Sequence, residues 1–118
     1  MTNAMNLQSI IDALNLNILT NLKDFSQIIP SSGYTSDLLS CVMSGASRQG
    51  IWITLQAHIN IVAVAALLDI CAVIITENAL PEPSTITKAN EEGITLLITK
   101  ESTFSVVGKL WELGLRPE

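Results

Sequence analysis

The spacing of apolar residues changes along the chain, and these changes predict alternating helices and strands. Leu7, Ile10, Ile11 and Leu14 recur every three or four residues, which predicts an amphipathic helix over residues 6–14. Farther along, short uninterrupted apolar runs alternate with longer segments of helical spacing. The expected strands are 16–20, 51–54, 71–76 and 94–99, and the expected helices are 6–14, 38–44, 60–69, 84–92 and 102–113.

Polar and glycine-rich segments separate these elements. A cluster of proline, serine and glycine predicts a loop across residues 21–35. We expect Ser36 or Asp37 to cap the helix at 38–44, and Gly45 to end it.

The order of elements predicts the fold class. Strands that alternate with helices of this length pair in parallel through right-handed crossovers. Uninterrupted apolar strands are typical of a sheet that is buried on both faces. We therefore expect one α/β domain over residues 1–118, with a mostly parallel sheet flanked by helices and a core of about 6–115.

A threonine closes each predicted strand: Thr20, Thr54, Thr76 and Thr99. If the strands are parallel, these hydroxyl groups gather at the carboxyl edge of the sheet, where open α/β sheets bind ligands. Threonine is also a favourable residue at a strand end, so both a ligand site and a purely structural role stay open.

The charge content limits the partners. Apolar residues make up 48% of the chain and charged residues 14%, with a net charge of −5 from 11 acidic and 6 basic residues. The basic residues are scattered, so we expect no nucleic-acid partner and no binding to an anionic membrane. A surface poor in charge favours self-association, and we expect a homodimer.

The last predicted helix offers a surface for that contact. Its apolar residues form two adjacent faces, which are wider than one sheet face needs. The faces consist of Phe104, Val107, Gly108 and Trp111, and of Val106, Leu110 and Leu113. Such a stripe usually packs against the core. Part of it can instead form a dimer contact, and we expect Leu110 to belong to that contact.

The single histidine is the strongest candidate for ligand chemistry. His58 lies in the loop between a strand and the helix that begins at Asn60. A histidine there can donate to a phosphate or carboxylate beside a helix N-terminus. It can equally be an exposed loop residue. The candidate ligand-binding residues at the carboxyl edge are Thr54, Gln56, His58, Asn60, Thr76, Glu77, Thr99, Ser102 and Thr103.

The sequence contains no motif for a metal site, a nucleotide cofactor or acid–base catalysis. The two cysteines, Cys41 and Cys71, lie in apolar runs, which predicts small buried side chains in a reducing, cytoplasmic protein. No ligand spacing suggests a metal, no glycine-rich phosphate loop suggests a nucleotide cofactor, and no second acid accompanies Glu77. We expect no metal, no cofactor and no catalytic residues. The N-terminus lacks the pattern of a signal peptide, and no apolar run is long enough to span a membrane.

Several segments together carry a family resemblance. Residues 33–43, 50–65, 91–94 and 102–104 resemble the small DRTGG-domain proteins, and the resemblance extends over about residues 6–115. The residues at the position of the family motif are Gly33, Tyr34, Ser36 and Asp37. Ser31-Ser32-Gly33 stands where Thr-Gly-Gly is expected, and no Asp-Arg pair precedes it.

The resemblance implies a fold similar to the N-terminal domain of HPr kinase/phosphorylase. It also implies regulation or assembly, since members stand beside CBS domains or accompany iron-only hydrogenase systems. The hypothesis is a non-catalytic regulatory domain that binds a small anionic or nucleotide-like ligand, or a protein partner. The alternatives are a docking or scaffold homodimer without a ligand, and an enzyme that uses His58.

Overall fold

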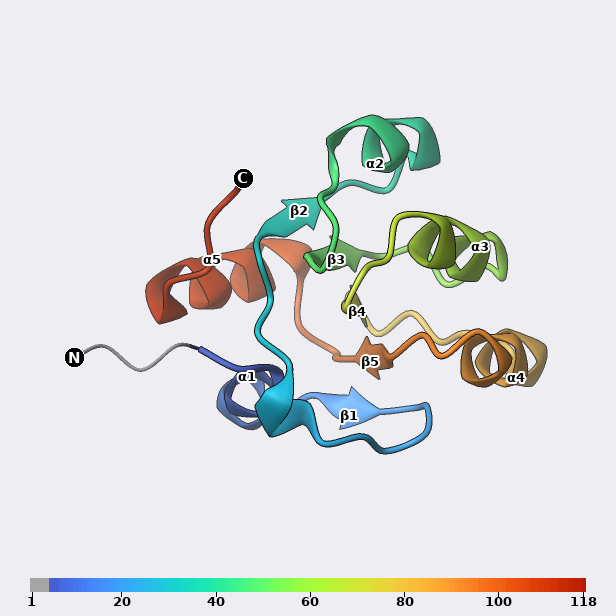
Figure 1. Cartoon of the computed structure of the whole chain (residues 1–118), viewed down its shortest axis with the longest axis horizontal. Coiled ribbons are helices and arrows are strands. Elements are labelled where there is room, and N and C mark those ends of the chain that lie inside the picture. The colour runs from blue at the N-terminus through green and yellow to red at the C-terminus, as the bar shows by residue number, and fades with distance from the viewer. Residues whose placement is uncertain (1–4) are drawn as a thin grey trace.

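Five strands form one mixed sheet in the order β1-β5-β4-β3-β2 (Figure 1). The structure is a computed structural model that describes residues 5–118. The strands are β1 (Asn17–Ile18), β2 (Gly33–Thr35), β3 (Ile51–Thr54), β4 (Ala72–Ile75) and β5 (Leu96–Ile98). Strands β2 to β5 are parallel to one another, and only the short β1 runs antiparallel to its neighbour β5. The expected mostly parallel α/β sheet is confirmed.

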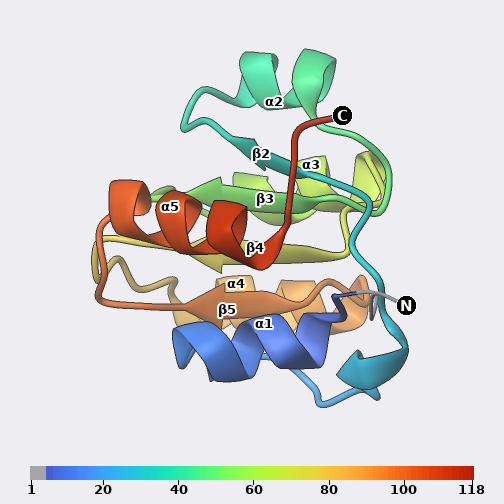
Figure 2. The same ribbon diagram turned by 90° about the vertical axis from the view of Figure 1, so that its left-hand side faces the viewer.

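Helices cover both faces of this sheet. They are α1 (Leu7–Leu14), α2 (Leu39–Gly45), α3 (Asn60–Leu67), α4 (Pro83–Glu91) and α5 (Thr103–Leu113), with a short 3-10 turn, η1, at Phe25–Gln27. Helices α2, α3 and α4 lie on one face, and α1 and α5 lie on the other, as Figures 1 and 2 show.

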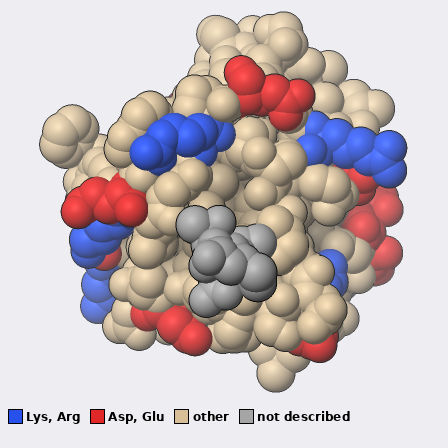
Figure 3. Space-filling view, turned by 60° about the vertical axis from the view of Figure 1, so that its left-hand side comes forward, with Lys and Arg blue, Asp and Glu red and all other residues tan. Residues whose placement is uncertain are grey.

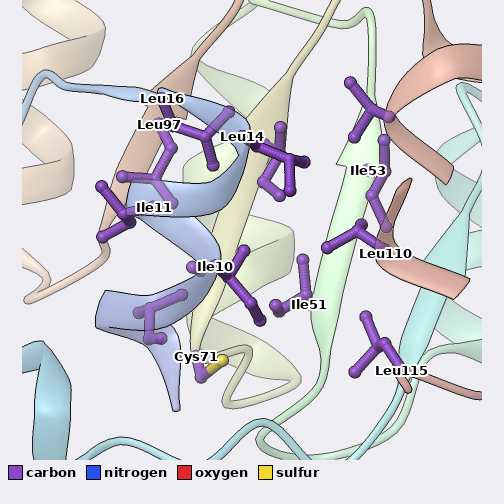
Figure 4. Close-up of a cluster of buried hydrophobic side chains, with 14 of the residues drawn as sticks. Ile10, Ile11, Leu14, Leu16, Ile51, Ile53, Cys71, Leu97, Leu110 and Leu115 are labelled. Carbon is purple, nitrogen blue, oxygen red and sulfur yellow. The ribbon is translucent and has the colours of Figure 1, made fainter. Parts of the chain in front are cut away.

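The central strands divide their side chains between two cores. Ile51 and Ile53 of β3 pack under α1 and α5, whereas Trp52, between them, packs under α2 and α3. Figure 4 shows the first of these cores, with Ile10 and Leu110 reaching it from α1 and α5. Because alternate side chains of a strand point to opposite faces, the uninterrupted apolar run of β3 fills both layers.

The structure corrects the expected loop at 21–35. Gly33–Thr35 forms β2, which pairs in parallel with β3 through Gly33↔Ile51 and Thr35↔Ile53. These residues lack an apolar run, so the strand depends on pairing with β3. The turn η1 also lies in this segment.

The caps of α2 also differ from expectation. The N-cap is Leu38 without a side-chain hydrogen bond, although Ser36 Oγ accepts from the Leu38 N–H at 3.1 Å. Gly45 is the last residue of α2, and its C-cap, Ala46, is not left-handed. A Cβ at Gly45 would lie 2.5 Å from the Tyr34 ring, so a larger side chain there would require that ring to move.

Three other expectations are corrected by burial and strand direction. Cys41 is exposed on α2, and only Cys71 is buried. Leu110 is 2% exposed and belongs to the core, so it is not available for a dimer contact. Thr20 lies at the amino edge of the sheet, because β1 is antiparallel, and its Oγ1 accepts from the Leu96 N–H.

Within residues 5–118, no helix combines the length and the apolar content that a membrane span requires. Residues 1–4, which belong to the segment that showed no signal-peptide pattern, lie outside the described residues.

Candidate functional site

Three of the threonines lie together at the carboxyl edge of the sheet. Thr54 is the last residue of β3, and Thr76 and Thr99 directly follow the neighbouring strands β4 and β5; the Thr76 N–H donates to the Thr54 carbonyl at 2.9 Å. The expected shared edge is therefore confirmed for these three. Their exposed fractions are 0%, 0% and 9%, so the side chains point into the protein and not into an open cleft.

Asp37 holds the first of these threonines. Its Oδ1 accepts from Thr54 Oγ1 at 2.7 Å and from the Leu55 N–H at 2.9 Å. Thr54 Oγ1 in turn accepts from the Gln56 N–H, and the Gln56 amide donates to the Asp37 carbonyl at 3.3 Å. The structure thus joins a motif residue, Asp37, to Thr54 and Gln56 in one network that fixes the β3–α3 loop. Sequence position alone predicts Ser36 or Asp37 as a helix cap, whereas the Asp37 carboxylate binds Thr54 and Leu55.

Glu77 holds the edge beside β4 and β5. Its Oε2 accepts from the Thr103 N–H at 2.7 Å, and the Thr103 and Thr76 hydroxyls lie 2.6 Å apart. Thr99 Oγ1 accepts from the Glu101 N–H, and Ser102 caps α5 through the Ser105 N–H. A carboxylate of the chain itself therefore occupies the N-terminus of α5, where an anionic ligand would otherwise be favoured.

A cavity of about 300 Å³ lies at the same edge, between the loops that lead into α3 and α4. Among the candidate residues, His58 is the one that lines it. Its Nδ1 accepts from the Asn60 N–H at 3.1 Å, so Nε2 is the ring nitrogen that carries the proton in the neutral side chain. The lining consists of Ala57, His58, Ile59, Leu80, Glu82, Ser84 and Thr85.

The wall of this cavity combines apolar and polar groups. Ile59 and Leu80 are 38% and 66% exposed, and they offer apolar surface at its mouth. Glu82 is the N-cap of α4 and makes no side-chain capping bond. Because Pro83 has no N–H, the first N–H group of α4 belongs to Ser84.

The remaining motif residues have structural contacts. Ser36 accepts at its carbonyl from Trp52 Nε1 at 2.9 Å, which satisfies the indole of a fully buried side chain. The Gly33 N–H donates to the Arg116 carbonyl at 3.0 Å, which ties the C-terminal tail to the edge strand β2. Tyr34 packs against Gly45, as described above.

A second cavity, of about 310 Å³, lies on the opposite face between β2, α5 and the C-terminal tail. Its wall is mostly apolar, and sequence spacing does not predict it, because it forms only when the C-terminal tail returns to β2. The apolar stripe of the last helix was its only local signal. The lining consists of Gly33, Tyr34, Thr35, Ile53, Val107, Leu110, Trp111, Leu115, Arg116 and Pro117.

Metal binding and thiol chemistry depend on the histidine, cysteine and acidic side chains of residues 5–118. No group of three or more histidine, cysteine or acidic side chains is arranged to hold a metal there. Burial raises the pKa of the Cys71 thiol to about 12, which disfavours the reactive thiolate.

The comparisons with known proteins bear on the fold. No family model matches the chain, and no curated protein matches it. Among solved structures, it is similar to the CBS and DRTGG domains of the regulatory region of Clostridium perfringens pyrophosphatase, complexed with its activator diadenosine tetraphosphate. The TM-score is 0.74 at 19% identity, over 91% of this chain and 46% of that chain. At this identity the likeness establishes the architecture, and the chain spans less than half of the neighbour's length. The chain therefore has a DRTGG-like α/β fold.

Proposed function

We propose that the chain is a non-catalytic regulatory module that binds a small nucleotide-like ligand in the cavity beside His58. The observation that carries the proposal is this cavity, which lies at the carboxyl edge of a parallel sheet. That edge is where open α/β sheets bind ligands. Its volume of about 300 Å³ lies at the lower end of small-molecule sites, so it suits a mononucleotide or one half of a larger ligand.

The groups around the cavity fit the three parts of a nucleotide. Ile59 and Leu80 cover an apolar base, as aliphatic side chains do in many ligand sites. Glu82 accepts hydrogen bonds from ribose hydroxyls, the role that acidic residues have in dinucleotide sites. His58 Nε2 and the Ser84 N–H donate to a phosphate, and the N-terminus of α4 favours its negative charge.

The rest of the carboxyl edge supports the site. The Asp37 network fixes the loop that carries His58, and the Glu77 network fixes the loop before α5. In this proposal Thr54, Gln56, Thr76 and Thr103 position the loops, while His58 contacts the ligand.

The structural neighbour supports the regulatory part of the proposal. That protein's fragment is a regulatory region bound to a nucleotide activator. For this chain, we propose that ligand binding changes its affinity for a protein partner and that it acts as a homodimer in the cytoplasm. An association with iron-only hydrogenase systems has no support among these observations and forms no part of the proposal.

A thermal-shift titration tests the ligand. A ligand that binds only the native state raises its stability, by about 2.7 kcal/mol at one hundred times the Kd. We expect AMP, ATP or diadenosine tetraphosphate to raise the melting temperature of the wild type in a saturable manner. The variant His58→Ala should weaken that response at least tenfold. Gln27→Ala, at an exposed position of η1, is the matched control and should respond like the wild type.

Two results would contradict the proposal. If none of the three nucleotides stabilises the wild type at millimolar concentration, the chain is not a nucleotide sensor. If one stabilises the wild type and His58→Ala equally, the ligand binds elsewhere. Turnover of the nucleotide that disappears in His58→Ala would favour the alternative of an enzyme that uses this histidine.

A further inference from the structure

Helix α5 presents two aromatic side chains to solvent on one face. Phe104 is 90% exposed and Trp111 is 52% exposed, and Gly108 lies between them. Residues four and three positions apart share one face of a helix, so these three residues form a continuous stripe. Figure 2 shows that no other helix or strand of the chain lies over the outward side of α5.

Charged groups of the chain lie beside this stripe, and one of them lies on it. Lys109 is on its flank and binds Glu101 at 2.7 Å, so that pair is neutralised within the chain. Arg116 stacks on the Trp111 ring, with its guanidinium carbon 4.0 Å from the ring centre. Figure 3 shows wide uncharged areas between scattered charged side chains on this side of the molecule.

No contact within the single chain requires glycine at position 108. A Cβ built on it meets no atom within 4 Å, and its backbone is ordinary helix. Glycine in a helix interior is less stable than alanine, so the folding of one chain gives no reason for it. Glycine on a helix surface permits the close approach of another backbone, and this is the reason that the exposed stripe suggests.

We propose that a second copy of this chain covers the stripe, in a two-fold contact between antiparallel α5 helices that cross at Gly108. This inference rests on the proposed homodimer and specifies its interface. Phe104 lies about 6 Å along the helix from Gly108 in one direction, and Trp111 lies about 4.5 Å away in the other. An antiparallel crossing therefore places Phe104 of each copy over Trp111 of the other.

The apolar cavity next to Trp111 makes the surface complementary to itself. Its wall includes Val107, Leu110 and Trp111 of α5, so it opens beside the half of the helix that would meet Phe104. In a two-fold dimer the Phe104 ring of each copy would contact the cavity of the other copy, so the same contact would form twice. The four aromatic side chains would bury on the order of 600 Å² that is now exposed, roughly a third of a standard interface.

Analytical ultracentrifugation of the full chain and its variants tests this contact. We expect a wild-type dimer whose dissociation constant rises at least tenfold in Phe104→Ala. It should rise as much in Gly108→Leu, whose added side chain has room in one chain but separates two crossing helices. Leu67→Ala is the matched control, since Leu67 is a 70% exposed leucine at the end of α3, on the other face of the sheet. It should dimerise like the wild type.

A cysteine at the crossing point gives a positive test. In a Cys41→Ser background, Gly108→Cys should form an intermolecular disulfide on mild oxidation, because a two-fold crossing brings the two Cα atoms within disulfide range. The variant Leu67→Cys in the same background should stay uncrosslinked.

The outcomes separate this inference from the proposals on which it rests. A wild type that is monomeric at high concentration refutes the homodimer and the interface together. A dimer that persists unchanged in Phe104→Ala and Gly108→Leu, without crosslinking at position 108, refutes only the interface. Ligand binding at His58 is measured independently and is unaffected by either result. Circular dichroism melting of each variant confirms that it folds, as expected for changes at open positions.

Discussion

Replacement of Asp37 by alanine tests the network that fixes the candidate ligand site. The Asp37 carboxylate receives two hydrogen bonds, from Thr54 Oγ1 at 2.7 Å and from the Leu55 N–H at 2.9 Å. These bonds connect the segment after β2 to the end of β3, 17 and 18 residues farther along the chain. In Asp37→Ala, the fully buried Thr54 hydroxyl loses its acceptor.

The expected loss of stability follows from these two bonds. Hydrogen bonds to a charged group contribute about 1.5–3 kcal/mol each when they are well shielded. Asp37 is exposed, so the lower part of that range applies to each bond. We therefore expect Asp37→Ala to lower the free energy of unfolding by about 2–3 kcal/mol. For a domain of this size the melting temperature should fall by roughly 6–12 °C.

Urea denaturation followed by tryptophan fluorescence provides the measurement. The matched control is Asp12→Ala on α1, whose carboxylate accepts a surface bond from Gln8 at 2.9 Å and no other within residues 5–118, and it should change stability by less than about 0.5 kcal/mol. A double-mutant cycle with Thr54→Val should show coupling of about 1 kcal/mol, because the two residues share one bond. Equal, small losses for Asp37→Ala and Asp12→Ala, with no coupling to Thr54, would refute this account of the loop.

Three further predictions concern single side chains. Among residues 5–118, Thr95 Oγ1 is a buried hydroxyl without a hydrogen-bond partner, so Thr95→Val should raise the free energy of unfolding by about 1 kcal/mol in urea titrations; a loss of stability would show that the hydroxyl is satisfied. Iodoacetamide at pH 8 should label the exposed Cys41 but not Cys71, because burial raises the pKa of Cys71 to about 12; mass spectrometry of native protein with two labels would contradict this. The hydrogen bond from Lys109 lowers the pKa of Glu101 below its ordinary value of 4.5. The wild type should therefore melt at a higher temperature than Glu101→Gln above pH 4.5, and this difference should disappear as the pH falls below 4.5. A difference in melting temperature that grows on acidification would contradict this expectation.

The sequence by itself determined the class of fold and the order of its main elements. Runs such as 51–53 and 72–75 are apolar at every position, and this local pattern is sufficient to predict strands buried on both faces. Because the helices between them force parallel crossovers, the common edge of Thr54, Thr76 and Thr99 also followed from the sequence.

The tertiary structure decided which partner each polar group found. Strand β2 consists of Gly33, Tyr34 and Thr35, which have no strand pattern of their own and become a strand by hydrogen bonding to β3. Asp37 has the position of a helix cap in the sequence, yet its carboxylate binds Thr54 and Leu55 in another loop. A hydrogen-bond acceptor binds whichever donor the fold brings within reach. The distance between two such groups in the folded chain cannot be read from their spacing in the sequence.

The orientation of helix α5 was likewise a tertiary outcome. Its sequence has more apolar positions than one sheet face can cover, so periodicity alone did not distinguish Leu110 from Phe104. In the structure Leu110 is buried and Phe104 is 90% exposed, because the sheet and the tail at Leu115 take up one side of the helix. Hydrophobic spacing determines that a helix has an apolar face, but the packing of neighbouring elements decides which part of that face is left for another molecule.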